Sequence, residues 1–324
     1  MVLSRPELNL LRFTCDLYAG EESPLASKSP ISETGNLQAV AQGLLDRKLV
    51  QEKSFRPTRE LLRRLLIASQ PDARVVLMRS EQHVHEALFE VYERAHVYMP
   101  YRCSKQEHEL DSPIEEKEVF NKIKNFFSPR GSTGDLIRID MNLAEYFVFS
   151  VLAGDLQKKQ ARKKRRVIAN SPTNDERAIS HTRGRGPSVI VSNTVDEEGT
   201  PIRGMLRDLP PELGSQASIP SPKHWEAALD RLIADDIVVE KNNRHSLRPY
   251  LHDLAEGLSS QRRYVLTRFD FVMEDWIVRD ASFITVPGSI FKLQAEAGGR
   301  VQIRELLQKD FGDEVWRVIK DPQP

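Results

Sequence analysis

The sequence is poor in several features that mark common protein classes. Only two of its 324 residues are cysteines, Cys15 and Cys103, which excludes a small fold held together by disulfides and fits a reducing cytoplasm. The longest apolar stretch, Phe147–Ala153, is far shorter than the roughly 20 residues that a membrane-spanning helix needs. The first residues, Met1–Glu7, lack the apolar core of a secretory signal. These absences predict a cytoplasmic protein without a membrane span.

An excess of charge of either sign is also missing. The 47 basic and 47 acidic side chains cancel, which argues against a protein dedicated to binding nucleic acid. Seven of the basic residues fall within residues 158–166, so the rest of the chain is mildly acidic. An apolar content of 40% and a charged content of 29% fit a globular protein that carries a disordered insert.

The motifs of common enzyme classes are absent as well. The chain contains no phosphate-binding loop, no dinucleotide-binding glycine turn and no nucleophile elbow. Cys103 and His108 form the one nearby Cys–His combination, and their spacing does not establish an activated thiolate. Acidic pairs such as Asp235 and Asp236 are adjacent and therefore diverge. We predict a protein that is not an enzyme and needs no cofactor.

Two weaker candidates for ligand sites have simpler interpretations. His83 and His85 share one face of an expected strand and His96 lies on a neighbouring strand, an arrangement that can hold zinc with a water as the fourth ligand. The second half of the chain offers apolar residues such as Phe283 in the comparable region, so we predict no metal site. Gly131–Asp135 resembles an anion-binding loop only in its small residues, and a plain loop before a strand is the simpler interpretation.

What the sequence does contain is an internal duplication. Leu44–Val50 matches Leu232–Val238 at an offset of 188 residues, and an Arg-Pro pair follows each block. Beyond this pair, both copies place leucines at helical spacing and then an apolar run typical of a strand, Arg74–Met78 in one copy and Arg263–Thr267 in the other. Several blocks in the same order are improbable by chance.

The two copies continue to match downstream. The alternating segment Val91–Pro100 parallels Val278–Pro287, which predicts antiparallel strands that each end at a proline. A closing helix is expected in each copy, around Val119–Phe126 in the first and around Ile303–Leu307 in the second.

An opening helix is shared at a smaller offset. Leu10–Gly20 aligns with Ala144–Gly154 at an offset of 134, so the rise to 188 places an insertion of about 54 residues in the second copy. We therefore predict an α+β fold that is internally duplicated with pseudo-two-fold symmetry, in which helices flank antiparallel sheets and some segments are similar to winged helices.

The same offsets predict a division of the chain into four parts. Residues 1–130 form the first repeat unit, and residues 131–157 supply the strand and opening helix of the second unit. Residues 158–220 form a flexible basic and polar insert, in which residues 189–191 are a candidate added strand. Residues 221–324 complete the second unit.

The insert begins with a dense basic patch. It can bind phosphates of nucleic acid or lipid, serve as a nuclear localisation signal, or form the solvated end of the preceding helix. We favour the last interpretation because no aromatic residue is interleaved for base stacking. The patch consists of Lys158, Lys159, Arg162, Lys163, Lys164, Arg165 and Arg166.

A nucleic-acid function is the alternative hypothesis. Leu45–Leu65 resembles the helix–turn–helix part of a winged helix, whose second helix enters the major groove. That helix offers Arg59, Arg63 and Arg64, but its counterpart in the second copy is acidic and aromatic. The pattern therefore supports the shape of a winged helix more than the binding of DNA.

Over both halves, the sequence resembles the EspG family of type VII secretion chaperones. The resemblance is carried by apolar spacing in the segments Leu3–Leu8, Pro24–Leu25, Gly43–Val50, Leu65–Pro71 and Arg74–Leu77. It implies a fold of two related halves with antiparallel strands flanked by helices. It also implies a cytoplasmic chaperone that binds one end of an elongated helical secreted protein or pair. The high content of Lys and Glu and the basic insert depart from the family pattern.

A chaperone of this kind needs an exposed apolar surface. Phe269, Phe271, Met273 and Trp276 lie within eight residues of one another, and such residues are enriched at the centre of interfaces. We predict that they bind the partner, with a core between the two halves as the competing interpretation. Exposed strand edges also leave a homodimer open.

Overall fold

The computed structural model describes residues 1–20, 23–26, 37–81, 84–104, 107–127, 136–169, 222–242, 244–259, 263–272, 275–296 and 299–320. The first copy of the repeat supplies β1 (Val2–Ser4), α1 (Arg5–Thr14), α2 (Leu37–Asp46), α3 (Arg59–Ser69), β2 (Ala73–Glu81), β3 (Val84–Arg94), β4 (Val97–Cys103), β5 (Glu107–Leu110) and α4 (Glu116–Phe126). The second copy supplies β6 (Arg138–Asn142), α5 (Leu143–Ala169), α8 (Pro222–Ala234), β7 (Val238–Lys241), β8 (Arg244–Leu247), η3 (Pro249–Leu251), α9 (His252–Ser259), β9 (Arg263–Val272), β10 (Asp275–Val286), β11 (Ser289–Glu296), β12 (Arg300–Leu306) and α10 (Gln308–Ile319).

One antiparallel sheet of ten strands unites the two copies. Its strand order is β1-β5-β4-β3-β2-β9-β10-β11-β12-β6. Read outward from the middle, each half runs through the same series of equivalent strands, so the second half repeats the first after a half-turn about the β2–β9 pair. This arrangement confirms the predicted α+β fold with internal duplication. The predicted sheets of the two halves are joined edge to edge into one.

The centre of symmetry lies between two equivalent residues. In the β2–β9 pair, Leu77 is opposite Leu266, and the flanking pairs Val76–Thr267 and Met78–Val265 are related by exchange of the two copies. Both central leucines are fully buried. The matched apolar runs of the two copies are therefore in direct contact along the middle of the sheet.

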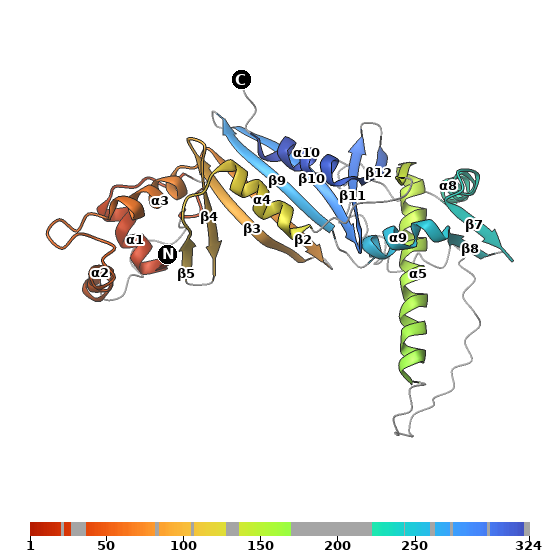
Figure 1. Cartoon of the computed structure of the whole chain (residues 1–324), viewed down its shortest axis with the longest axis horizontal. Helices are drawn as coiled ribbons and strands as arrows, with labels where there is room; N and C mark the ends of the chain where they lie inside the picture. The colour runs from red at the N-terminus through yellow and green to blue at the C-terminus, as the bar shows by residue number, and fades with distance from the viewer. Residues whose placement is uncertain are drawn as a thin grey trace.

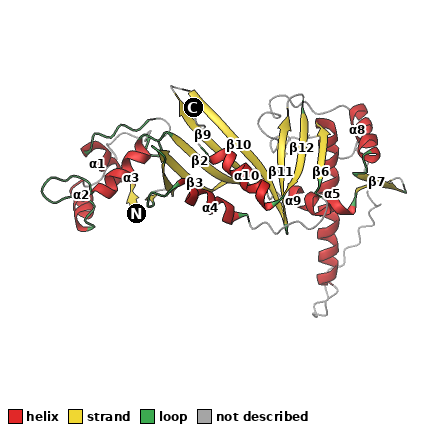
Figure 2. Cartoon of the chain, turned by 45° about the horizontal axis from the view of Figure 1, so that its top comes forward, coloured by secondary structure: helices red, strands yellow, loops and turns green. Residues whose placement is uncertain are grey.

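Helices cover the sheet in three groups. The closing helices α4 and α10 lie side by side over the central strands (Figure 2), and Phe120 stacks on Trp316 between them at a ring distance of 4.5 Å. Helices α1, α2 and α3 lie at one end of the elongated molecule, and α5, α8 and α9 lie at the other (Figure 1). Each group encloses its own cluster of buried apolar side chains, so three cores stabilise one sheet.

The opening helices begin with the same capping arrangement. Ser4 caps α1 and its backbone N–H donates to Glu7, while Asn142 precedes α5 and its backbone N–H donates to Glu145. These equivalent pairs set the offset at 138 residues, so the predicted alignment at 134 was wrong by four. A shift of four residues is close to one helical turn and keeps the same face apolar, which is why the apolar pattern did not reveal it.

The strands that follow are equivalent in the two copies, but their register also differs from the predicted one. Pro100 lies inside β4, opposite Val91 of β3, whereas Pro287 lies in the two-residue turn between β10 and β11. The turn equivalent to that of Pro287 is formed by Ala95 and His96, which both have positive φ. The expectation that both strands end at a matched proline was therefore wrong, since apolar alternation does not specify strand register by itself.

The second closing helix starts later than expected. Ile303 and Leu306 belong to strand β12, in which the side chains from Val301 to Glu305 are alternately buried and half-buried. Helix α10 begins only at Gln308 and buries Phe311, among others, against the central strands. The apolar triplet around residue 303 fits both a strand and a helix, which explains the wrong prediction.

The predicted insert starts inside a helix. Helix α5 continues to Ala169. The prediction that a flexible connector begins at residue 158 is therefore wrong for the backbone of residues 158–169. The candidate strand at residues 189–191 lies outside the described residues.

Between α8 and α9, the strands β7 and β8 form a short hairpin, which gives the second copy its segment similar to a winged helix. Over the described part of the chain, no helix is long and apolar enough to cross a membrane.

Candidate partner-binding surface

The β9–β10 hairpin carries exposed apolar side chains near its end. The two strands pair continuously from Arg263–Ile284 to Val272–Asp275. Within the last residues of the hairpin, Val272 is 45% exposed, Ile277 is 47% exposed and Val278 is 55% exposed. Apolar residues at this level of exposure, close together on one element, are typical of an interaction site.

Two of the predicted binding residues lie on this hairpin. Phe269 and Phe271 are half-buried and belong to none of the three clusters of buried apolar residues. Residues alternate between the faces of a strand, and the neighbouring Arg268 lies on the face covered by α10. Phe269 and Phe271 therefore lie on the opposite face of the sheet.

The other two predicted residues are described less fully. Trp276 is the register partner of Phe271 in the β9–β10 pair, and its side chain lies outside the described part of the structure. Met273 lies outside the described residues. The structure thus brings Phe269, Phe271 and the backbone of Trp276 into one hairpin, as expected from their spacing, and the choice between surface and core for the whole group stays a prediction.

A charged side chain borders the phenylalanines. The guanidinium carbon of Arg74 on β2 lies 5.9 Å from the centre of the Phe269 ring and 5.8 Å from that of Tyr92. Its Nε lies 2.8 Å from the carboxylate of Glu90. The apolar surface therefore has a polar rim, as protein interfaces commonly do.

The equivalent hairpin of the first copy is polar. Phe269 and Val278 in the second copy correspond to Ser80 and His85 in the first, because Ser80 is equivalent to Phe269 and the two residues of each pair are opposite each other. The β2–β3 pair has a register shift between Leu77 and Met78 that the β9–β10 pair lacks. An exposed ion pair between Arg79 and Glu86, 2.6 Å apart, lies beside them. The sequence already indicated an apolar region in the second copy where the first has histidines, and the strand register adds which individual positions correspond.

A buried ion cluster supports the apolar hairpin from beneath. Arg268 is 1% exposed, and its Nε lies 2.6 Å from Asp270 while its Nη2 lies 2.7 Å from Glu93. Its Nη1 donates to the carbonyl of Ile319 at 2.7 Å and to the hydroxyl of Tyr98 at 3.0 Å. The guanidinium thus joins both copies and the last turn of α10.

The electrostatics of this cluster are balanced. Burial by itself lowers the pKa of Arg268, but the Tyr98 hydroxyl and the carboxylates of Asp270 and Glu93 raise it above its ordinary value. Burial and the Glu93 carboxylate raise the pKa of Tyr98 to about 12. Arg279 also pairs with Asp270 at 2.8 Å. Two cations thus face two carboxylates, which fits a structural role beneath the hairpin.

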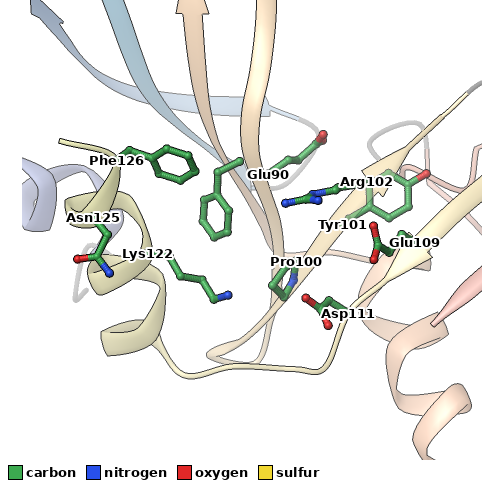
Figure 3. A pocket seen from close by; sticks show the side chains of 10 residues that line it. Glu90, Pro100, Tyr101, Arg102, Glu109, Asp111, Lys122, Asn125 and Phe126 are labelled. Carbon is green, nitrogen blue, oxygen red and sulfur yellow. The ribbon is translucent and has the colours of Figure 1, made fainter. Parts of the chain in front are cut away.

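A separate pocket lies between α4 and strands β3 to β5 (Figure 3). It has a volume of about 350 Å³, and Lys122 extends from α4 across it toward Pro100 and Asp111. Phe89 and Phe126 form an apolar wall with a ring distance of 6.3 Å. Its described lining combines aromatic rings with charges of both signs and contains no cysteine, serine or histidine: Phe89, Glu90, Pro100, Tyr101, Arg102, Glu109, Asp111, Lys122, Asn125 and Phe126.

The histidine and cysteine candidates do not form a reactive centre in the described structure. His83 and the side chain of His85 lie outside the described residues, and His96 lies in the β3–β4 turn. Among the residues that are described, no group of three or more metal-binding side chains occurs. Cys103 is opposite His108 in the β4–β5 pair, but Nδ1 of the imidazole lies 2.6 Å from the Tyr101 hydroxyl.

The arginines of the alternative hypothesis are divided between surface and core. Arg59 and Arg63 on α3 are exposed, but Arg64 is 5% exposed and donates to the carbonyl of Leu110 at 2.9 Å. Arg64 therefore stabilises the contact of α3 with β5 and is not available to phosphates, which corrects the prediction for this residue. The side chains of the basic patch on α5 lie outside the described part.

Comparison with known proteins identifies a similar fold. No model of a protein family and no curated protein sequence matches the chain. The solved structure of the Mycobacterium tuberculosis type VII secretion system chaperone EspG5 in complex with the PE25–PPE41 dimer is similar over 100% of this chain and 96% of that chain, with a TM-score of 0.52 and 8% sequence identity. The likeness shows the fold, and it agrees with the fold implied by the sequence resemblance.

Proposed function

We propose that this protein is a non-enzymatic chaperone or adaptor that holds a helical protein partner in the cytoplasm, in the manner of type VII secretion chaperones. The observation that carries the proposal is the difference between the two hairpins of the repeat: one is polar, and the other carries Phe269, Phe271 and the exposed Val278 on one face. The similarity of fold to a chaperone that was solved with a bound protein dimer supports it.

The hairpin has the physical properties that a helical partner requires. An amphipathic helix buries its apolar face in an apolar groove or on an apolar sheet surface, and aromatic residues at the centre contribute most of the affinity. The buried Arg268 cluster holds the strand beneath Phe269 in place, so little ordering free energy is lost on binding.

The test compares equivalent positions of the two hairpins. Val278→Asp places a charge on the apolar hairpin, and His85→Asp places it at the equivalent position of the polar hairpin. Tagged full-length protein is purified from the native host, and the bound proteins are quantified by mass spectrometry. We expect a small helical secreted protein or pair to co-purify with the wild type and with His85→Asp, and its recovery to fall by about tenfold with Val278→Asp.

Two outcomes would contradict the proposal. Equal recovery of the helical partner with both variants would show that the hairpin is not the binding surface. Recovery of nucleic acid in place of a protein partner, with an affinity that falls steeply with salt, would favour the alternative function.

A further inference from the structure

The two outer strands of the sheet, β1 and β6, differ in whether side chains bind their outward backbone groups. At the first edge, β1 is three residues long, and the side chain of Arg47 donates to the outward carbonyl of Val2. The outward N–H of Ser4 donates to Glu7. Side chains of the same copy thus occupy two of the outward hydrogen-bonding groups of this short edge, which hinders its pairing with another strand.

At the second edge, β6 is five residues long and pairs with β12 on one side only. Glu305 of β12 donates its backbone N–H to the carbonyl of Ile137 at 2.8 Å. Because backbone groups alternate in direction along a strand, those of Ile139 and Met141 also point toward β12, whereas those of Arg138 and Asp140 point outward. Within the described residues, no hydrogen bond occupies the outward backbone groups of Arg138 and Asp140.

The duplication provides an internal control for this difference. At the offset of 138 set by the helix caps, Asp140 is equivalent to Val2. In the first copy, Arg47 binds Glu7 at 2.9 Å. In the second copy, Arg231 binds the equivalent Glu145 at 3.3 Å. Over the described part of the chain, Arg231 makes no bond to the edge strand. The second copy therefore keeps the ion pair but leaves the edge open.

A groove follows the open edge. It has a volume of about 650 Å³ and lies between β6 and the segment that connects α8, β7 and α9. Leu136 is 43% exposed and Tyr250 is 53% exposed, and the Tyr250 hydroxyl donates to the carbonyl of Asp236 at 3.2 Å. Figure 2 shows β6 as the last strand of the sheet, with α8 and β7 beyond it. The described lining consists of Leu136, Ile137, Arg138, Ile139, Asp140, Asp235, Ile237 and Tyr250.

We infer that this edge binds an extended segment of a protein partner, which adds to the sheet as an eleventh strand. The outward N–H and C=O groups of Arg138 and Asp140 recognise the backbone of the segment, and Leu136 and Tyr250 receive its apolar side chains. The occupant is a single strand because the α8–β7 segment closes the far side of the groove, where the sheet of a second copy would have to continue. This inference is independent of the apolar hairpin and of the proposed chaperone function.

The first test uses a proline at the edge. A library of random 12-residue peptides displayed on phage is selected against the full-length protein, and the enriched peptide is labelled and titrated by fluorescence anisotropy. Asp140→Pro removes one outward N–H but spares the bonds to β12, and Asp140→Ala is the matched control that loses the same ion pair with Arg300. We expect Asp140→Pro to weaken binding about tenfold and Asp140→Ala to leave it nearly unchanged.

Hydrogen exchange provides the second readout. The amides of Arg138 and Asp140 should exchange rapidly in the free protein and slowly in the complex. If Asp140→Pro fails to fold, as judged by circular dichroism, Tyr250→Ala replaces it and should weaken binding through the groove wall.

Three results would overturn the inference. The first is that both Asp140 variants bind the peptide with equal affinity. The second is that the amides of Arg138 and Asp140 are already protected from exchange in the free protein. The third is that the protein forms a dimer through this edge, which Asp140→Pro dissociates in sedimentation experiments.

Discussion

Leu77 and Leu266 occupy equivalent positions in the two copies of the repeat and are opposite each other at the centre of the sheet. Both are fully buried in the central core beneath α4 and α10. The contact at which the two halves meet is therefore a contact of one position with its own duplicate, as at the two-fold axis of a symmetric dimer.

This relationship predicts matched losses of stability. Leu77→Ala and Leu266→Ala should each lower the free energy of unfolding by about 2–5 kcal/mol, because each leaves a cavity in the same core. Urea denaturation followed by circular dichroism measures the two values. A large cost at one position and almost none at the other would contradict a symmetric centre.

The buried Arg268 cluster predicts a second loss. Arg268→Met leaves the carboxylates of Glu93 and Asp270 buried without their main partner, which should cost about 3–5 kcal/mol of stability. Arg79→Met is the matched control, because Arg79 is the equivalent residue of the first copy and its ion pair is exposed; it should cost at most about 1 kcal/mol. Equal effects in thermal unfolding would show that the cluster contributes no more than a surface pair.

Stability should fall at acidic pH through Glu314. Burial alone raises the pKa of this carboxyl, but hydrogen bonds and charge from Lys292 and Arg317 lower it below its ordinary value, and Arg304 lies 3.0 Å away. Since the folded pKa is lower than the unfolded one, the carboxylate stabilises the fold above about pH 4.5 and loses this effect as the pH falls through the folded pKa. Glu314→Gln should flatten the pH dependence of the melting temperature below pH 4.5, and an unchanged profile would refute this assignment.

Two glycines should respond in opposite directions to alanine. A Cβ atom at Gly257 in α9 would lie 2.6 Å from Val286 and 2.8 Å from Ile284 of β10, whereas nothing lies within 4 Å of one at Gly154 in α5. Gly257→Ala should therefore cost about 1–3 kcal/mol, and Gly154→Ala should gain up to about 1 kcal/mol from helix propensity. Thermal unfolding of both variants checks the sign. A stabilised Gly257→Ala would mean that α9 can move away from the sheet.

The duplication was readable from the sequence because both copies bury the same apolar positions. The exact alignment of the two copies could not be predicted from the sequence, because a shift of one helical turn keeps the apolar face of α1 and α5 in place. Ser4 and Asn142 carry the missing signal, because the capping pairs they form identify equivalent helix starts. In the strands, the two-residue turns at Ala95–His96 and Pro287–Gly288 carry it.

The candidate surfaces depend on register even more strongly. Clustering in sequence was enough to select Phe269 and Phe271, because a hairpin brings close neighbours together. The contrast with Ser80 requires the pairing of β2 with β9, and the contact between Arg268 and Glu93 joins residues that are 175 positions apart. No local pattern specifies either of these relationships.

The joining of both halves through β2 and β9 has a consequence for biosynthesis. Strand β2 ends at Glu81, and its partner β9 begins only at Arg263, so a ribosome that adds about 5–20 residues per second needs roughly 10–40 seconds to supply the second strand after the first. Throughout that interval, the nascent first half exposes β2 as an open edge, which is a template for mispairing with other chains. Each newly made molecule therefore depends on its own β9 to pair with β2 before a strand of a neighbouring chain on the same polysome pairs with it.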